Sequence, residues 1–572
     1  MKEIEVRGTR TAPRRRPASL NIPQRAEACL RHMLENVDPK FGYVPFVGAT
    51  LGERRPHFVH HRLDWTEVLP YDIYGLVVAR ELTGDQRGIE IQQAQRRLYL
   101  GFFNEMDGLI HAPRSPWNSP YPLDLWEQAR ALYALVYWFQ DSGEERLLEV
   151  IRGVVDGLFA LSWQEGRMRV FPPSLLRTAG GSLYSVGALI DPLAKVYELT
   201  GNPRAFQLAA GLTAFMLEPA NGYFDAEGGF WSSYRFVVAV INGLARFAAL
   251  TAEPELASRV KRIHDRALAW ATRFGSDPGL EPACSNMELN YSALSLTRLG
   301  FTEYWDQIDR FTRNHTVEAQ FLDPAVWVEK KAAPGRILDQ EKWVYENWPD
   351  DLEVLPYDDY RDVVNRCLGG FVWTVSADEH LFLPATIMLC CSAHALRTFQ
   401  LVWNHCLTEG VGGFQVNLHF NCENELGEVV SYEPFAGRTA VTLKRDGRLR
   451  VRVPEFALGG ELKATRGGKP CALSVSGRYA DLGQVQAGVE HVLEYPLRER
   501  QTEEKQFVLK DKDCAFLEKT LSYQARWRGN TVVGLSPESR EEKRMYKRRQ
   551  LDTDRVQEAD VSYFVSGKKI TW

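Results

Sequence analysis

Long apolar runs and a strong net charge are both absent from this sequence. No stretch of about 18 uncharged apolar residues occurs, so we expect no membrane-spanning helix. No apolar run of about seven residues follows the basic start of the chain, so residues 1–25 are interpreted as a flexible, solvated tail and not as a secretion signal. The 69 Lys and Arg against 74 Asp and Glu give a net charge of −5, which excludes a global field that would hold nucleic acid or an anionic membrane. We therefore expect a cytoplasmic protein with neither of these partners.

Cysteine is also scarce. Nine cysteines in 572 residues lack the dense, regular spacing of a disulfide scaffold, and in a reducing compartment such thiols serve burial, metal binding or catalysis. Aromatic residues, in contrast, are plentiful, with 15 Trp, 22 Tyr and 28 Phe. Sugars stack on flat apolar faces of this kind, so the composition favours a carbohydrate ligand.

The first 400 residues repeat one pattern, in which an apolar helix is followed by a turn with glycine and by a second, amphipathic helix. The turn glycines Gly84, Gly143 and Gly201 lie 59 and 58 residues apart. Each supplies the left-handed residue with which a helix often ends, and a fixed period indicates stacked helical units. Weaker copies follow at residues 238–255 and 288–300, and a sixth begins near Cys390.

The first helix of each pair is apolar on nearly every side, and between residues 129 and 139 only Arg130 is charged. Such a helix must be enclosed all round. Six of these hairpins predict an (α/α)6 toroid in residues 26–412, with six inner and six outer helices. An open helical solenoid is the alternative, but it would have more uniform repeats than a chain with a long insertion between Gly300 and Cys390.

After about residue 412 the pattern changes to the alternation that is typical of strands. The segment 438–456 alternates apolar residues on both sides of Asp446-Gly447, which predicts a β-hairpin. We interpret residues 413–572 as a β-sandwich region. The predicted fold class is therefore mainly α with appended β.

Three cysteines are candidate metal ligands. Cys390 and Cys391 are adjacent, and Cys284 lies in a separate segment. Adjacent thiols rarely bond to each other but can bind one soft cation, and two or three thiolates with a carboxylate or an imidazole form an ordinary Zn²⁺ site. Burial of the same cysteines as small hydrophobic residues is the alternative.

Longer segments around these cysteines resemble the β-L-arabinofuranosidase group, glycoside hydrolase family 127 and its relatives. The resemblance runs from about residue 71 to residue 537. Its most specific parts are the Cys-Cys pair after a Gly-Gly-Phe segment and a pattern made by Tyr304, Trp305, Asp306, Arg313 and Asn314. It implies an (α/α)6 barrel followed by β-sandwich domains, and a retaining glycosidase that removes a terminal sugar.

In that family a zinc-bound cysteine attacks the anomeric carbon. The resemblance implies that Cys390 is this nucleophile and that Cys284 and Cys391 are zinc ligands. Glu281 would complete the metal site or act as the acid/base, because the family has glutamate two residues before the matched cysteine and this chain has Pro282 there. A zinc-bound thiol is deprotonated at neutral pH, and a covalent route splits one difficult substitution into two.

Three further residues are candidates for substrate binding. Trp126 and Glu127 begin an inner helix at the predicted mouth of the toroid, where an indole and a carboxylate would hold a sugar. A helix N-terminal acid favoured by the macrodipole is the alternative for Glu127. His394 lies one helical turn from Cys390 and is interpreted as a substrate contact, a ligand or a buried core histidine.

Two other functions remain open. A carboxylate-only six-hairpin glycosidase or lyase would have Glu127 among its candidate acids and would keep Cys390 as a structural residue. A non-catalytic carbohydrate-binding relative would have lost the chemistry, and Pro282 is the best support for it. The expected partner is an oligosaccharide or glycoside, and the sequence is compatible with a homodimer. The polar segment 60–65 is interpreted as a surface loop.

Overall fold

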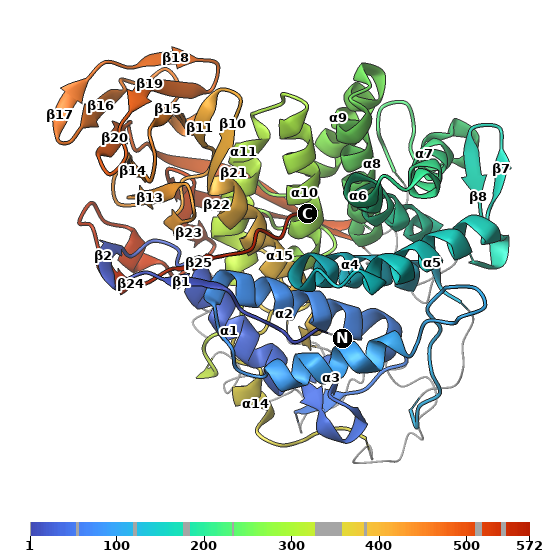
Figure 1. Ribbon diagram of the computed structural model, residues 1–572. Helices are drawn as coiled ribbons and strands as arrows, with labels where there is room; N and C mark the ends of the chain where they lie inside the picture. The colour runs from blue at the N-terminus through green and yellow to red at the C-terminus, as the bar shows by residue number, and fades with distance from the viewer. Residues whose placement is uncertain are drawn as a thin grey trace.

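The computed structural model describes residues 2–52, 56–117, 123–175, 183–230, 234–325, 357–381, 386–509, 517–538 and 545–572. A helical part comes first, and mostly antiparallel sheets follow it (Figure 1). The helices are α1 Ile22–Glu35, α2 Leu69–Thr83, α3 Ile89–Leu100, α4 Leu125–Ser142, α5 Arg146–Leu161, α6 Ile190–Thr200, α7 Pro203–Leu217, α8 Tyr234–Thr251, α9 Pro254–Leu268, α10 Pro282–Arg298, α11 Tyr304–Phe311, α14 Val363–Arg366 and α15 Leu389–Cys406.

In the described part of the chain, six helices contact one another in a closed circuit. The circuit runs from α2 through α4, α6, α8 and α10 to α15, which returns to α2. Every residue of α2 is buried, and so are the first fourteen residues of α4. The predicted enclosure is therefore confirmed for α2 and α4. The interior of the circuit is the place where side chains from distant parts of the sequence meet.

The predicted turn glycines end three of these helices. Gly84, Gly143 and Gly201 are the C-caps of α2, α4 and α6, with φ of 66°, 59° and 68°. Each cap donates its N–H to the carbonyl four residues earlier, which satisfies a group that the helix end leaves open. The following helix then packs outside the circuit, as α7 does on α6 and α9 on α8.

Three sheets make up most of the second half of the described chain. The five-stranded sheet has the order β10 Leu407–Gly410, β11 Gly413–Val416, β15 Gly447–Arg452, β19 Tyr479–Val485 and β18 Ser474–Ser476. The six-stranded sheet has the order β12 Cys422–Glu423, β13 Gly427–Ser431, β14 Arg438–Leu443, β20 Glu490–Glu494, β16 Lys463–Arg466 and β17 Lys469–Cys471. A third sheet holds β21 Glu499–Leu509, β22 Leu517–Arg528 and β23 Thr531–Ser536.

The predicted hairpin at Asp446-Gly447 is wrong. The strands on its two sides, β14 and β15, belong to different sheets and do not pair with each other. Past the end of β14 the backbone stays beside β13, because Lys444 donates its N–H to the carbonyl of Leu426 at 2.9 Å. Asp446 then accepts the N–H of Ala487 at 2.8 Å. The turn residues therefore serve a crossing from one sheet to the other, which a local signal cannot distinguish from a hairpin.

The prediction of a flexible tail in residues 1–25 is also wrong. Strand β1 Gly8–Arg10 pairs with β25 Phe564–Ser566, and β2 Arg14–Pro17 pairs with β24 Glu558–Val561. Arg16 forms a two-point ion pair with Glu428, at 2.8 and 2.9 Å. The basic cluster is held by carboxylates that lie more than 400 residues away in the sequence, so local composition cannot reveal them.

The last described residues enter the interior of the helix circuit. The ring of Trp572 stacks on Tyr133 and Tyr137, with ring centroids 4.4 and 5.1 Å away, and its indole N–H donates to Asp191 at 2.9 Å. The preceding Ile570 bonds through its backbone to groups in the second halves of α2 and α15. This segment therefore closes the circuit at the end towards which these helices run.

Replacing Trp572 by phenylalanine is expected to lower the free energy of unfolding by about 1–3 kcal/mol, because the buried indole N–H bond to a carboxylate is lost. Asp191 keeps Tyr133 and Arg246 as partners, so its charge stays compensated. Denaturant titration followed by circular dichroism measures the change. The matched control is Trp163→Phe, at a ring that is 45% exposed, which should change stability by less than about 0.5 kcal/mol. An equal effect of the two substitutions would contradict the assigned packing.

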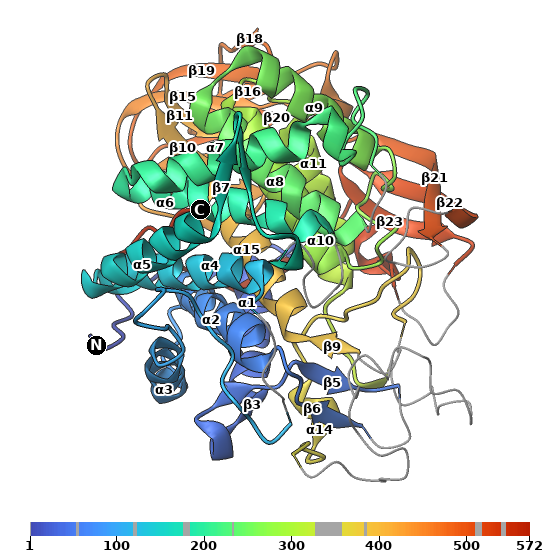
Figure 2. The same ribbon diagram turned by 90° about the vertical axis from the view of Figure 1, so that its right-hand side faces the viewer.

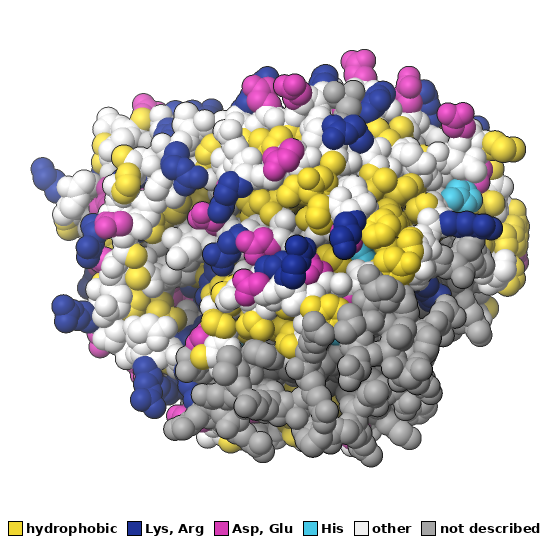
Figure 3. Space-filling model, turned by 90° about the horizontal axis from the view of Figure 1, so that it is seen from below, with side chains coloured by type: hydrophobic (Ala, Val, Ile, Leu, Met, Phe, Trp, Pro, Cys, Tyr) yellow, Lys and Arg dark blue, Asp and Glu magenta, His cyan; other side chains and the backbone are white. Residues whose placement is uncertain are grey.

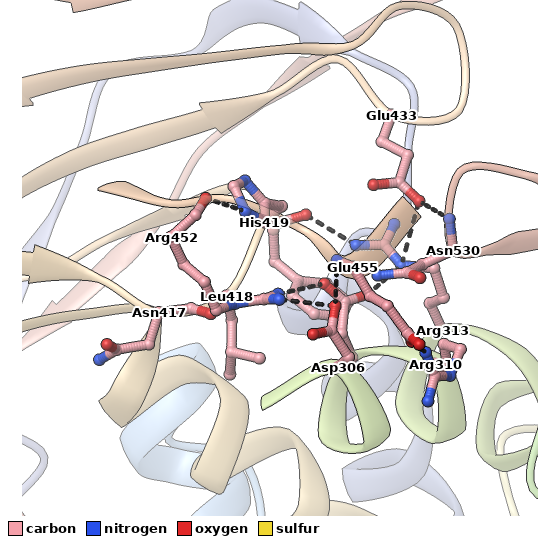
Figure 4. Close-up of polar contacts among 12 residues, drawn as sticks. Asp306, Arg310, Arg313, Asn417, Leu418, His419, Glu433, Arg452, Glu455 and Asn530 are labelled. Carbon is pink, nitrogen blue, oxygen red and sulfur yellow. Dashed lines mark hydrogen bonds and ion pairs between the residues drawn. The ribbon is translucent and has the colours of Figure 1, made fainter. Parts of the chain in front are cut away.

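A buried ionic network joins α11 to the sheets. Arg452 of β15, with no exposed surface, donates to Asp306 at 2.7 Å and lies 3.4 Å from Asp309. Figure 4 shows Asp306 and Arg452 pointing toward each other across this boundary, with Arg313 and Glu433 beside them. The helical part and the sheets are therefore fixed to each other by charges that water does not reach.

A small sheet holds the start of α15. Strand β9 Ile387–Met388 pairs with β5 Gly48–Thr50, which pairs in turn with β6 His57–Val59 (Figure 2). Leu389 continues this pairing by donating its N–H to the carbonyl of Val47 at 3.1 Å. The first turn of α15, which carries the Cys-Cys pair, is thus fixed by a strand next to it.

Charges of both signs are interspersed on the face seen in Figure 3, in agreement with the small net charge. By length and composition α8 is apolar enough to cross a membrane, but 78% of that window is buried inside the protein. Such burial is typical of a core helix, and α8 packs between α6 and α10.

Candidate active site

Two helices of the circuit bring the three predicted cysteines together. Cys284 is the third residue of α10, and Cys390 and Cys391 are the second and third residues of α15. The sulfur of Cys391 lies 3.5 Å from that of Cys284 and 3.9 Å from that of Cys390, and all three sulfurs lie within 4.8 Å of one another. The convergence predicted from the sequence is therefore present.

Only one of these thiols reaches the surface of the site. Cys284 and Cys391 have no exposed surface, whereas Cys390 is partly exposed. Hydrogen bonds from Cys284, the larger effect, and from Cys391 favour the thiolate of Cys390 and lower its pKa to about 5. Burial acts in the opposite direction and raises this pKa. Burial raises the pKa of Cys391 well above the usual value. Cys390 therefore combines partial exposure with a lowered pKa, which are the features of a reactive cysteine.

The side chains around the sulfurs come from the first turns of several helices. Tyr71 is the third residue of α2, Trp126 the second of α4 and Arg235 the second of α8. The N-terminal end of a helix carries a positive partial charge, which stabilises an anion such as a thiolate. Cys284 and Cys390 themselves lie in the first turns of α10 and α15, so the N-terminal ends of these two helices favour a thiolate at the site.

The three sulfurs fit a zinc ion. Two thiolates bound to one tetrahedral Zn²⁺ at about 2.3 Å lie about 3.8 Å apart. The separations of 3.5 and 3.9 Å are close to this value. The donor set of three soft sulfurs also suits zinc more than magnesium or calcium.

The fourth predicted ligand is placed differently. The carboxylate of Glu281 does not belong to the group of donor atoms that lie within 4.8 Å of one another. Glu281 precedes α10, Pro282 takes the first position of that helix, and the carboxylate lies 3.3 Å from Nε of Arg235. The carboxylate of Glu281 is thus paired with an arginine, and the group of three cysteine sulfurs does not include it. Its role as a metal ligand stays a prediction.

His394 lies behind the sulfurs and not on their open side. Its Nδ1 is 3.1 Å from Sγ of Cys284, and its ring packs edge-on against Tyr71 with centroids 5.0 Å apart. The residue has no exposed surface, and burial lowers its pKa to about 4, so the ring is neutral at pH 7. His394 is therefore positioned to orient the thiol of Cys284. As a fully buried side chain, it does not reach a substrate in this conformation.

Trp126 and Glu127 point in different directions. Consecutive residues of a helix do not share a face. Trp126 donates its indole N–H to Glu67 at 2.8 Å and has the guanidinium of Arg130 3.9 Å above its ring. Glu127 is 2% exposed and acts electrostatically on Tyr99 of the outer helix α3. The carboxylate that Trp126 contacts is therefore that of Glu67, and the role of Trp126 and Glu127 in binding a sugar stays a prediction.

Glu67 is a site residue that the sequence analysis missed. It belongs to a π-helical turn, η2 Asp64–Val68, that leads into α2. The neighbouring segment was expected as a surface loop, but Asp64 is fully buried and His60 is 3% exposed, 2.7 Å from it. A buried anchor of this kind fixes the turn. The available signal was an acidic residue just before a helix, but acidic residues are too common at helix starts to single out Glu67.

Comparison by sequence gives no relatives, since no protein-family model and no curated protein matches the chain. Comparison of structures does. The chain resembles in fold a family 127 β-L-arabinofuranosidase from Geobacillus stearothermophilus, with 15% identity, a TM-score of 0.53, and 89% of this chain and 82% of the other covered.

Two further solved structures are similar. A protein described as a glycoside hydrolase has 15% identity and a TM-score of 0.57, with 92% of this chain and 83% of the other covered. A family 127 β-arabinofuranosidase has 13% identity and a TM-score of 0.56, with 90% and 81% covered. Identities this low show a shared fold over most of the chain, and the chemistry must be argued from the site itself.

Proposed function

We propose that this protein is a retaining glycoside hydrolase that removes a terminal sugar of the β-L-arabinofuranoside type, with Cys390 as a zinc-bound nucleophile. Its fold would be an (α/α)6 toroid followed by a β-sandwich. The observation that carries the proposal is the trio of sulfurs at the spacing of zinc ligands, of which Cys390 alone is partly exposed. The solved structures of similar fold are named for the same activity.

In the proposed reaction each thiol has a separate task. Cys390 presents its sulfur to the anomeric carbon, while Cys284 and Cys391 hold the metal from the buried side. A bound zinc ion supplies positive charge that keeps the thiols deprotonated at neutral pH. His394, against Cys284, fixes the direction of that sulfur.

The carboxylate-only alternative is less well supported. It relied on Glu127, whose side chain is buried, with 2% of its surface exposed. A thiol with a pKa lowered to about 5 at the surface of the site is also unusual for a structural cysteine. The thiol mechanism is therefore the function that the geometry supports best.

The purified protein is expected to contain about one zinc ion per chain, measured by elemental mass spectrometry. Cys284→Ser should lose most of this zinc, because a hydroxyl does not replace a thiolate ligand. Cys471→Ser, in β17, is the matched control and should keep it. With an aryl β-L-arabinofuranoside, proton NMR of the sugar first released should show the anomer of the substrate. A zinc-free wild type, or release of the opposite anomer, would contradict the proposal.

A further inference from the structure

The carboxylates around the sulfur trio differ in their access to solvent. Glu281 is 9% exposed, and Asp277 and Glu288 are each 1% exposed. Glu67 is partly exposed. Of these four carboxylates, Glu67 is the one most exposed to solvent.

The other three carboxylates are occupied by the protein. Glu281 lies against the guanidinium of Arg235, at 3.3 Å. Asp277 accepts the backbone N–H of Gly279 at 2.8 Å, and Glu288 accepts the amide of Asn242 at 2.8 Å. Each of them is therefore buried and has a protein partner for at least one of its oxygens.

Glu67 is held by one oxygen only. Its Oε1 accepts the indole N–H of Trp126 at 2.8 Å and the phenol O–H of Tyr71 at 3.4 Å. Its Oε2 accepts no hydrogen bond from the residues that the structure describes. The carboxyl group is thus oriented by two neutral donors and keeps one oxygen for an external partner. Burial raises the pKa of Glu67, so it holds a proton to higher pH than an ordinary glutamate does.

Tyr71 links this carboxyl group to the sulfur trio. Its phenol donates to Glu67, and the edge of its ring meets the ring of His394, whose Nδ1 touches Cys284. The phenol feels the charge of Glu67 and that of Cys390 together. The nucleophile and Glu67 therefore flank one aromatic side chain at the first turn of α2.

We propose that Glu67 is the general acid and base of the hydrolase, a role that rests on the proposed function. In the first step Oε2 of Glu67 gives its proton to the glycosidic oxygen. That oxygen keeps the electron pair of the bond it loses, while a sulfur electron pair of Cys390 forms the new bond to the anomeric carbon. In the second step Glu67 takes a proton from water, the water oxygen bonds to the anomeric carbon, and the electron pair of the carbon–sulfur bond returns to Cys390.

The test compares two leaving groups in Glu67→Gln. The amide can still accept the Trp126 indole N–H but carries no acidic proton, so cleavage of a methyl β-L-arabinofuranoside should fall by about 10² to 10⁴-fold. A nitrophenyl glycoside needs little protonation of its phenol, so its first step should persist. The sugar should then accumulate on the Cys390 peptide in mass spectrometry. Added azide, which needs no base, should restore turnover and yield a glycosyl azide.

Two controls make the outcome decisive. Glu90→Gln, at an exposed position of α3, should change neither rate, and the melting temperature of Glu67→Gln should stay near that of the wild type. An equal loss on both substrates, or the selective loss in Asp277→Asn instead, would overturn the role of Glu67 and leave the thiol mechanism intact. A wild type that cleaves neither glycoside would overturn the proposed function, and the role of Glu67 with it.

Discussion

Cys390→Ser is expected to lower kcat/KM for an aryl β-L-arabinofuranoside by about 10⁴-fold or more, because removal of a nucleophile leaves only binding and electrostatic contributions. Serine is close to cysteine in size, but its hydroxyl does not ionise near neutral pH, even beside the thiols of Cys284 and Cys391 that lower the pKa of Cys390 to about 5. Steady-state kinetics on the purified variant measure the loss.

The controls for this substitution address folding and the other cysteines. Cys471→Ser, in β17 of the six-stranded sheet, should retain wild-type kcat/KM. The far-ultraviolet circular dichroism of Cys390→Ser should match that of the wild type, since the side chain lies at the partly exposed edge of the trio. Unchanged activity in Cys390→Ser would exclude the thiol mechanism and favour the carboxylate-only alternative.

Asp306→Ala is expected to lower the free energy of unfolding by about 3–5 kcal/mol, because it leaves a buried charge without its main partner. Asp306 is 1% exposed and holds Arg452, at 2.7 Å, together with the backbone N–H of Glu455, at 3.1 Å. After the change, Arg452 would keep only the longer contact to Asp309 and a backbone carbonyl. The midpoint and slope of denaturant unfolding measure the difference.

An exposed ion pair provides the comparison for this prediction. Glu409 pairs with Arg445 on the surface, and both side chains are at least 40% exposed. Glu409→Ala should therefore cost less than about 1 kcal/mol. If Asp306→Ala cost no more than Glu409→Ala, the network of Figure 4 would not be what fixes the helical part to the sheets.

The features predicted correctly from the sequence are those with a local or periodic signal. Helices apolar on all sides must be enclosed, and glycine ends α2, α4 and α6 where a left-handed residue is needed. The convergence of Cys284 with Cys390 and Cys391 came from a resemblance to a family and not from spacing. Because α10 and α15 pack together only in the folded circuit, a separation of more than 100 residues carries no geometric information.

The features that were missed depend on partners far away in the chain. Glu67 was not among the candidates, and its hydrogen bond with Trp126 joins residues that lie 59 positions apart. The pairing of Glu281 with Arg235 of α8 was not predicted either, and the role of Glu281 as a ligand or acid/base stays a prediction. The chain crosses between two sheets at Asp446 with the composition of a hairpin turn. Only the strand pairing distinguishes this crossing from a hairpin. In each case the deciding contact comes from another element.

Trp572 and Ile570 fill the end of the helix circuit that lies away from the first turns carrying Cys284 and Cys390. Under the proposed function, a sugar would therefore enter and leave from the other end. An oligosaccharide would then present only its last unit to the sulfur of Cys390. The proposed hydrolase would shorten a polysaccharide stepwise from a chain end and would not cut it into fragments.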